Sequence, residues 1–210
     1  GIRDYKVTGV QTCALPISRV STPTGTYAGG TAANGCREFK GIRYATAGRF
    51  EAPVTVETDG GEIDATSWGK IAHQTPGFLE SNDGFGPDDM SEDCHFLNIW
   101  TPAGATEGAS LPVLFWVHGG GFLTGSGSAS WYNGANLAAR GAVVVTINYR
   151  LGVFGYLGNR NLGLLDQVAA LRWVSRNIAA FGGNPGNVTV FGESAGGSGT
   201  VSIMASPLAT

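Results

Sequence analysis

The stretch Asn187–Gly197 constrains the fold of this chain more than any other. It reads as a short buried strand, a sharp turn and the start of a helix, with β-branched and aromatic residues in the strand. Gly192 and Gly196 flank Ser194 in the pattern G-x-S-x-G. A serine at the tip of such a turn has a strained backbone, so its neighbours two positions away must lack bulky side chains. The turn also presents the hydroxyl beside the first N–H groups of the helix.

The composition is that of a globular protein with a substantial core. Of the 210 residues, 42% are hydrophobic and 14% are charged, and the formal net charge is −3. No basic run is present, which argues against nucleic acid or an anionic membrane as a partner. No apolar run reaches the length needed to span a bilayer. The three cysteines are too few for a disulfide framework.

Residues 1–18 do not read as the beginning of a domain. Most of this segment corresponds to the translation of a common short-read sequencing adapter. We therefore interpret residues 1–18 as non-native and exclude them from the fold. On this interpretation Cys13 leaves the cysteine count. The native N-terminus is then unknown, so the sequence indicates no cellular compartment.

The remaining chain alternates between strands and helices. An antiparallel opening is expected over residues 20–50, followed by an irregular segment over 51–90. The apolar run Leu111–Val117 predicts a central strand covered on both faces. Strands separated by helices predict right-handed crossovers and a mostly parallel sheet, with active groups at the carboxyl ends of the strands. The further elements expected are strands over 91–100, 142–149 and 187–191 and helices over 131–140, 164–181 and 195–205.

A second glycine-rich loop, His118–Gly121, follows the strand 111–117 and is expected to face the serine turn. Ser194 is the candidate nucleophile. Attack on an ester carbonyl places negative charge on oxygen, which preorganised N–H donors must stabilise. The amide of Ala195 is expected to be one donor, and the amides of Gly120 and Gly121 the others, because backbone without side chains can approach the oxygen closely.

The loop at 118–121 and the acidic segment at 83–89 each have an alternative interpretation. The loop at 118–121 could be a plain connection or a phosphate cradle, but neither G-x-G-x-x-G nor G-x-x-x-x-G-K-[ST] occurs, which disfavours nucleotide binding. The acidic segment 83–89 lacks the ligand spacing of a calcium loop, so a solvated loop is expected there and no metal site is predicted.

A serine nucleophile needs a base and a group that orients the base. The chain has three histidines, His73, His95 and His118, and all of them precede Ser194. Where this turn carries a catalytic serine, the order along the chain is serine, acid, histidine. We expect His118 to organise its loop, and His73 and His95 to be structural. The base and its carboxylate are therefore missing, which a truncated chain would explain, and the chain alone is expected to be inactive.

Five motifs in order resemble the type-B carboxylesterases, the cholinesterase-like branch of the α/β-hydrolase fold. The resemblance covers residues 19–210 and implies that they form the N-terminal part of one such domain. It implies an α/β-hydrolase fold that is cut after the nucleophile turn, with a mostly parallel central sheet, flanking helices and an antiparallel N-terminal portion. It also implies that the acid, usually Glu, and the histidine lie beyond Thr210. The motifs are Ser91–Cys94 with Leu97-Asn98, His118–Phe122, Asn148–Arg150, Gly163–Pro185 and Phe191–Gly197.

The resemblance also implies roles for individual side chains. Two ion pairs, Arg150–Asp166 and Arg49–Glu92, would be structural. Glu193, beside the candidate nucleophile, would tune the site electrostatically.

The chain departs from the family pattern around Cys94. The family often pairs this cysteine with one about twenty positions earlier, where this chain reads Ile71-Ala72-His73. Cys94 is thus expected to be unpaired, with Cys36 as the less favoured alternative partner, so disulfides do not indicate an oxidising compartment. His95 replaces the usual leucine.

The resemblance implies a serine hydrolase that cleaves uncharged or weakly polar carboxylic esters through an acyl-enzyme on Ser194. A small-molecule ester is the expected partner; no cofactor and no protein partner are implied. The alternatives are a non-catalytic adhesion or binding protein of the same fold, and an amide or thioester hydrolase on the same scaffold.

Overall fold

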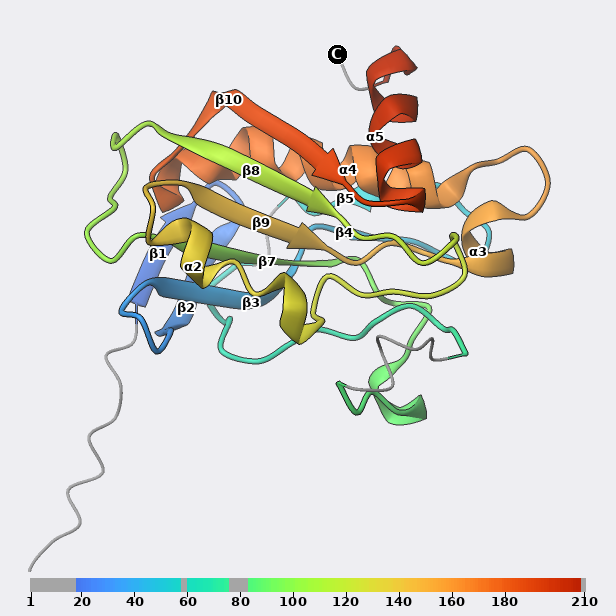
Figure 1. Cartoon of the computed structure of the whole chain (residues 1–210), viewed down its shortest axis with the longest axis horizontal. Coiled ribbons are helices and arrows are strands. Elements are labelled where there is room, and N and C mark those ends of the chain that lie inside the picture. Colours follow the sequence, from blue (N-terminus) through green and yellow to red (C-terminus); the bar gives the residue numbers. More distant parts are fainter. Residues whose placement is uncertain (1–17, 58–59, 76–82, 209–210) are drawn as a thin grey trace, which may run out of the picture.

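The computed structural model describes residues 18–57, 60–75 and 83–208. Apart from Ser18, the segment interpreted as adapter-derived lies outside these residues, and Ser18 is the first residue of strand β1. Figure 1 shows a central sheet viewed on its face, with α2 in front of the sheet and α4 behind it.

The main sheet has eight strands in the order β1-β2-β3-β7-β9-β8-β10, with β6 paired to β2. β8 is parallel to both β9 and β10, so these three strands end at the same edge of the sheet, at the right of Figure 1. β7 is antiparallel to β3 and β9, so the antiparallel part expected over residues 20–50 continues through β7. The bounds are β1 Ser18–Thr22, β2 Gly25–Thr31, β3 Arg37–Arg43, β6 Glu62–Asp64, β7 Phe96–Thr101, β8 Leu111–Val117, β9 Val143–Ile147 and β10 Gly183–Gly192, with β4 Ala45–Thr46 and β5 Val54–Thr55 forming a separate pair.

The long helix forms where the apolar stripe predicts it. It continues into a 3₁₀ turn and ends at Gly182, whose φ of 91° is the left-handed conformation that glycine adopts readily. The helix expected over 131–140 is instead a 3₁₀ turn followed by a short helix. Gly134 lies between these two segments and packs closely on the side chains of Trp100 and Val144, so the backbone turns at this residue. The helices are α2 Ala135–Ala138, α3 Gly152–Tyr156, α4 Leu162–Asn177 and α5 Ala195–Ala205, and the 3₁₀ turns are η1 Pro87–Asp89, η2 Ser130–Tyr132 and η3 Ile178–Phe181.

The strand expected over residues 91–100 begins only at Phe96, so the prediction was wrong for residues 91–95. The Phe96 amide donates to the carbonyl of Cys94 at 2.8 Å, a tight turn that ends extended pairing. Cys94 and His95 are both fully buried, so this turn directs their side chains into the core.

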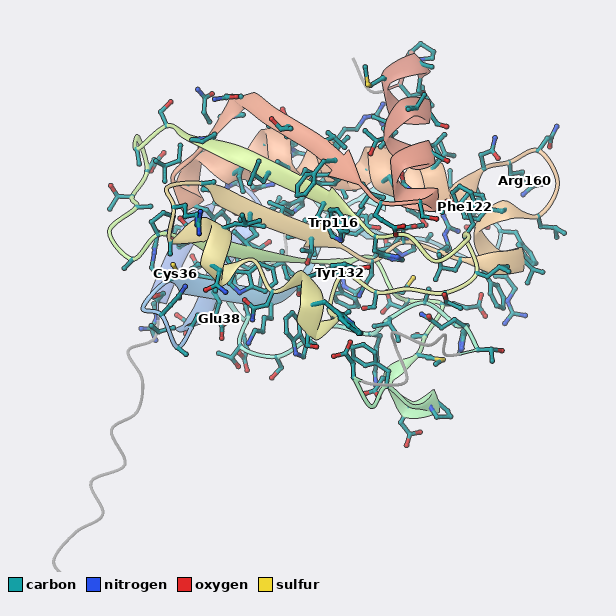
Figure 2. The ribbon with its side chains drawn as sticks, in the orientation of Figure 1. Cys36, Glu38, Trp116, Phe122, Tyr132 and Arg160 are labelled. Atoms are coloured by element: carbon teal, nitrogen blue, oxygen red, sulfur yellow. The ribbon has the colours of Figure 1, made fainter. Side chains whose placement is uncertain are left out.

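The core lies mainly between the sheet and α4. β8 contributes Val113, Phe115 and Val117 to it, all fully buried. On the opposite face Leu114 and Trp116 are only half-buried, so the prediction that this strand is covered on both faces was wrong. The reason is that α2, on that face, has four residues and leaves the sheet open beside it. The hollow there is lined by the side chains of Trp116, Trp131, Tyr132, Leu137 and Phe191, of which Figure 2 labels Trp116 and Tyr132.

Candidate active site

The predicted strained turn is present between β10 and α5. β10 ends at Gly192 and α5 begins at Ala195, which leaves Ser194 at the tip. Ser194 has φ 54° and ψ −120°, a conformation that costs a non-glycine residue on the order of 1–3 kcal/mol. The residue is exposed at the surface. Strain of this size persists where the surrounding structure imposes it, and it concentrates at functional sites.

The glycines two positions either side of Ser194 are required by close backbone contacts. A Cβ on Gly196 would lie less than 3.0 Å from the carbonyl oxygens of Val117 and His118. A Cβ on Gly192 would lie 2.7 Å from the Val117 oxygen and the same distance from the Gly196 oxygen. The turn therefore packs directly on the end of β8, where the second glycine loop begins.

The two glycine-rich loops face each other, as predicted. A Cβ on Gly119 would lie 2.6 Å from a carboxylate oxygen of Glu193 and 3.2 Å from the Cβ of Ser194. The loop then turns sharply, because the carbonyl of Gly120 accepts hydrogen bonds from the amides of Leu123 and Thr124, both at 3.0 Å. Gly120 and Gly121 have φ of 105° and 63°, which glycine adopts without strain.

Several backbone N–H groups at this junction have no partner. Among the described residues, the amides of Gly120, Gly121 and Ala195 donate no hydrogen bond. Gly120 and Gly121 are exposed, and Ala195 opens the first turn of an eleven-residue helix. The N-terminus of a helix carries a partial positive charge and free N–H groups, which favour an anion. The junction can therefore stabilise a developing negative charge beside the Ser194 hydroxyl.

His118 is placed to orient the glycine loop. Its ring is buried and stacks on Tyr149 with centroids 4.4 Å apart, and Nδ1 lies 2.8 Å from the carbonyl oxygen of Gly119. The Tyr149 hydroxyl donates to the His118 carbonyl at 2.7 Å. Burial lowers the pKa of His118 to about 4, so the ring is neutral at pH 7 and Nδ1–H donates to Gly119. The Gly119 carbonyl and the Gly120 amide belong to one peptide, so this bond sets the direction of the Gly120 N–H.

The other two histidines lie elsewhere, as expected. His95 is buried, with Nε2 3.0 Å from Oδ1 of Asp166. His73 is exposed and lies near the ring of Phe154. Among the described residues, no hydrogen bond joins any histidine to the side chain of Ser194. None of the three histidines is therefore placed as a base for Ser194 in the part of the chain that the structure describes.

The ion pair between Arg150 and Asp166 is confirmed. The guanidinium of Arg150 donates to both carboxylate oxygens, at 2.7 and 2.8 Å. Burial alone would raise the pKa of Asp166, but the hydrogen bonds from Arg150 and His95 outweigh it, and the pKa lies below its ordinary value. His95 thus has a structural explanation: its ring is buried against the Asp166 carboxylate, which also pairs with Arg150.

The remaining predictions about side-chain pairing also hold. Arg49 and Glu92 form an ion pair at the surface. Cys36 and Cys94 are free thiols, and both are buried.

Within the described ranges no group of three or more His, Cys, Asp or Glu side chains is arranged to hold a metal ion. No described helix is both long and apolar enough to cross a membrane.

One contact with the glycine loop was not foreseen from the sequence. The side chain of Gln74 bonds both backbone groups of Gly125, at 2.7 and 2.9 Å. The two residues are 51 positions apart, and Gln74 belongs to none of the motifs quoted above. No local pattern could have revealed it.

Comparison with known proteins identifies the family. The model of the Carboxylesterase family matches residues 17–210. The chain is 47% identical over 193 residues to the para-nitrobenzyl esterase of Bacillus subtilis, which covers 86% of this chain and 39% of that protein. It is 46% identical over 191 residues to the cocaine esterase of Homo sapiens, covering 83% of this chain and 34% of that protein.

Solved structures agree with this match. A thermophilic PNB esterase superimposes with a TM-score of 0.83 at 44% identity, covering 93% of this chain and 42% of that one. A carboxylesterase of Geobacillus stearothermophilus gives a TM-score of 0.81 at 44% identity, with 91% and 41% covered. The chain thus spans less than half the length of these relatives. With its mixed sheet, flanking helices and glycine-flanked serine turn, the chain belongs to the carboxylesterase family and has the α/β-hydrolase fold.

Proposed function

We propose that the protein containing this chain is a carboxylic ester hydrolase that uses Ser194 as its nucleophile. The observation that supports this most strongly is the exposed, strained Ser194 at a junction where the amides of Gly120, Gly121 and Ala195 have no partner among the described residues. The family relationship supports the same reaction. The proposed substrates are small, uncharged or weakly polar esters.

In the proposed reaction the Ser194 oxygen attacks the acyl carbon while a base takes the hydroxyl proton. The carbonyl oxygen becomes an oxyanion, held by the amides of Gly120, Gly121 and Ala195. Its collapse breaks the ester bond, the alcohol leaves with the proton, and the acyl group stays on Ser194. Water then attacks the acyl-enzyme in the same way, which releases the carboxylic acid and restores the serine.

The base and its carboxylate partner are proposed to come from the part of a family-length protein that this chain does not contain. Two observations support this: the described histidines make other contacts, and the relatives are more than twice as long as the chain. His118 would act as a positioning residue for the Gly119–Gly120 peptide. Glu193, which is exposed and borders Gly119, would tune the electrostatic potential at the nucleophile.

A non-catalytic binding role explains these features less well. Backbone strain at Ser194 costs stability, and binding alone does not require a strained serine at the tip of the turn. Hydrolysis of amides or thioesters would use the same groups, so substrate profiling against matched esters, thioesters and amides separates those activities.

The test uses the family-length polypeptide encoded with this chain. Turnover of a short-chain aryl ester is measured for the wild type, for Ser194→Ala and for Ser198→Ala, an exposed serine one turn further along α5. Ser194→Ala should lose more than about a thousandfold in kcat, because the acyl-enzyme cannot form, whereas Ser198→Ala should keep wild-type activity. An aryl phosphonate should label Ser194 by mass spectrometry. Undiminished turnover in Ser194→Ala would refute the proposal.

A further inference from the structure

Gln74 lies in the segment Lys70–Gln74, far from Ser194 in the sequence, yet it contacts the candidate oxyanion loop. Its Oε1 accepts the amide of Gly125 at 2.7 Å, and its Nε2 donates to the carbonyl of Gly125 at 2.9 Å. Nε2 also donates to the Ala72 carbonyl at 3.1 Å, which anchors the side chain to its own segment. One side-chain amide thus bonds both backbone groups of one loop residue, and this fixes the position and direction of that residue.

Gly125 in turn packs against the hydrogen bond that orients the loop. A Cβ on Gly125 would lie less than 3.0 Å from Nδ1 of His118 and from the carbonyl oxygen of Gly119. These two atoms are the partners of the 2.8 Å bond described above. A displacement of Gly125 would therefore disturb the Gly119–Gly120 peptide, whose N–H is one of the three unpaired donors.

A second set of bonds joins the same two segments. Asn148, just after β9, donates from Nδ2 to the Lys70 carbonyl at 3.2 Å. Its Oδ1 accepts the Ser126 hydroxyl at 3.1 Å and the Gly127 amide at 2.8 Å. Asn148 thus holds the loop at residues 126–127. Gln74 holds it at Gly125, the residue whose Cβ position lies 2.5 Å from the Gly119 carbonyl oxygen.

We propose that Gln74 is a positioning residue for the oxyanion hole, acting through Gly125 and His118 on the Gly120 amide. This inference rests on the proposed esterase function. A donor aimed at the oxyanion contributes more in the transition state than in the bound substrate. Loss of the Gln74 bonds should therefore lower kcat and leave KM nearly unchanged.

The experiment compares three variants in the family-length polypeptide. Gln74→Leu removes both bonds to Gly125 at similar side-chain size. Gln74→Glu keeps an acceptor for the Gly125 amide but, when ionised, loses the donor. Thr75→Ala, at the exposed neighbouring position, is the matched control. Rates are expressed per active site titrated with an aryl phosphonate, so unfolded molecules do not contribute.

We expect kcat per titrated site to fall about tenfold to a hundredfold in Gln74→Leu, less than the loss of a whole oxyanion donor. KM should stay within about twofold, Gln74→Glu should be intermediate, and Thr75→Ala should match the wild type. A trifluoromethyl ketone, which forms a tetrahedral oxyanion adduct, should lose affinity by the same factor as kcat/KM. A purely structural role would lower the titratable fraction and move neither quantity.

The experiment distinguishes failure of the positioning role of Gln74 from failure of the proposed esterase function. A per-site kcat for Gln74→Leu equal to that of Thr75→Ala would overturn the positioning role, provided that Ser194→Ala is inactive. Turnover by Ser194→Ala would instead overturn the esterase function itself.

Discussion

Gly196 and its neighbour Gly197 offer a matched test of how the serine turn packs on β8. Both glycines lie in the first turn of α5, so replacing either by alanine gains similar helix propensity, at most about 1 kcal/mol. Their surroundings differ. A Cβ on Gly196 would lie less than 3.0 Å from backbone atoms of Val117 and His118. A Cβ on Gly197 would meet the carbonyl group of Gly192, with the oxygen at 3.4 Å and the carbon at 4.0 Å, which are ordinary contacts.

The difference between the variants isolates the cost of the clash. Because the obstructing atoms are backbone, they cannot rotate away, and overpacking of this kind costs about 1–3 kcal/mol. Gly196→Ala should therefore be about 1–3 kcal/mol less stable than Gly197→Ala. Relief of the clash would also move the end of β8, where the candidate oxyanion loop starts, and a misplacement of about 1 Å can cost about a hundredfold in rate.

The assay measures melting temperature and kcat/KM for aryl ester hydrolysis in the family-length polypeptide. Gly196→Ala should melt at a lower temperature and turn over more slowly, while Gly197→Ala should equal or exceed the wild type in stability and keep its activity. Equal stability and equal turnover in the two variants would show that the turn does not pack on β8 as described.

Three further predictions concern the scaffold. Burial lowers the pKa of His118 from 6.5 to about 4, so between these pH values the unfolded state binds a proton and the folded state does not. The free energy of unfolding should therefore fall by up to about 3 kcal/mol as the pH drops from about 6.5 to about 4. His118→Gln should flatten the plot of melting temperature against pH over this range. Arg150→Met should cost about 3–5 kcal/mol because it removes the guanidinium that pairs with the buried Asp166 carboxylate. Arg49→Met, at an exposed pair, should cost no more than about 1 kcal/mol by denaturant titration. The 210-residue chain should self-associate through the open sheet face, where Trp131 and Leu137 are 52% and 44% exposed, and Leu137→Lys should shift its sedimentation toward the monomer.

Local patterns predicted the elements that depend on neighbouring residues. The G-x-S-x-G spacing indicated the turn at Ser194, since a positive φ and crowding two positions away are properties of a short segment. The apolar run of β8 and the stripe of α4 likewise followed from periodicity. The pattern was misleading at residues 91–95, where β-type composition competes with a turn that buries Cys94 and His95.

Local sequence patterns were therefore enough to predict the candidate nucleophile, its glycine neighbours, the second glycine loop and the family. The contacts that hold that loop became visible in the folded chain: the stack of His118 on Tyr149 and the bonds from Gln74 to Gly125. The fold likewise revealed that one face of β8 is half-covered and that His95 lies against the pair of Arg150 and Asp166. The two groups of features differ in the sequence separation of the residues that interact. Backbone strain and apolar periodicity act within a few residues, whereas these contacts join segments far apart in the chain, and only the folded arrangement of the strands brings them together.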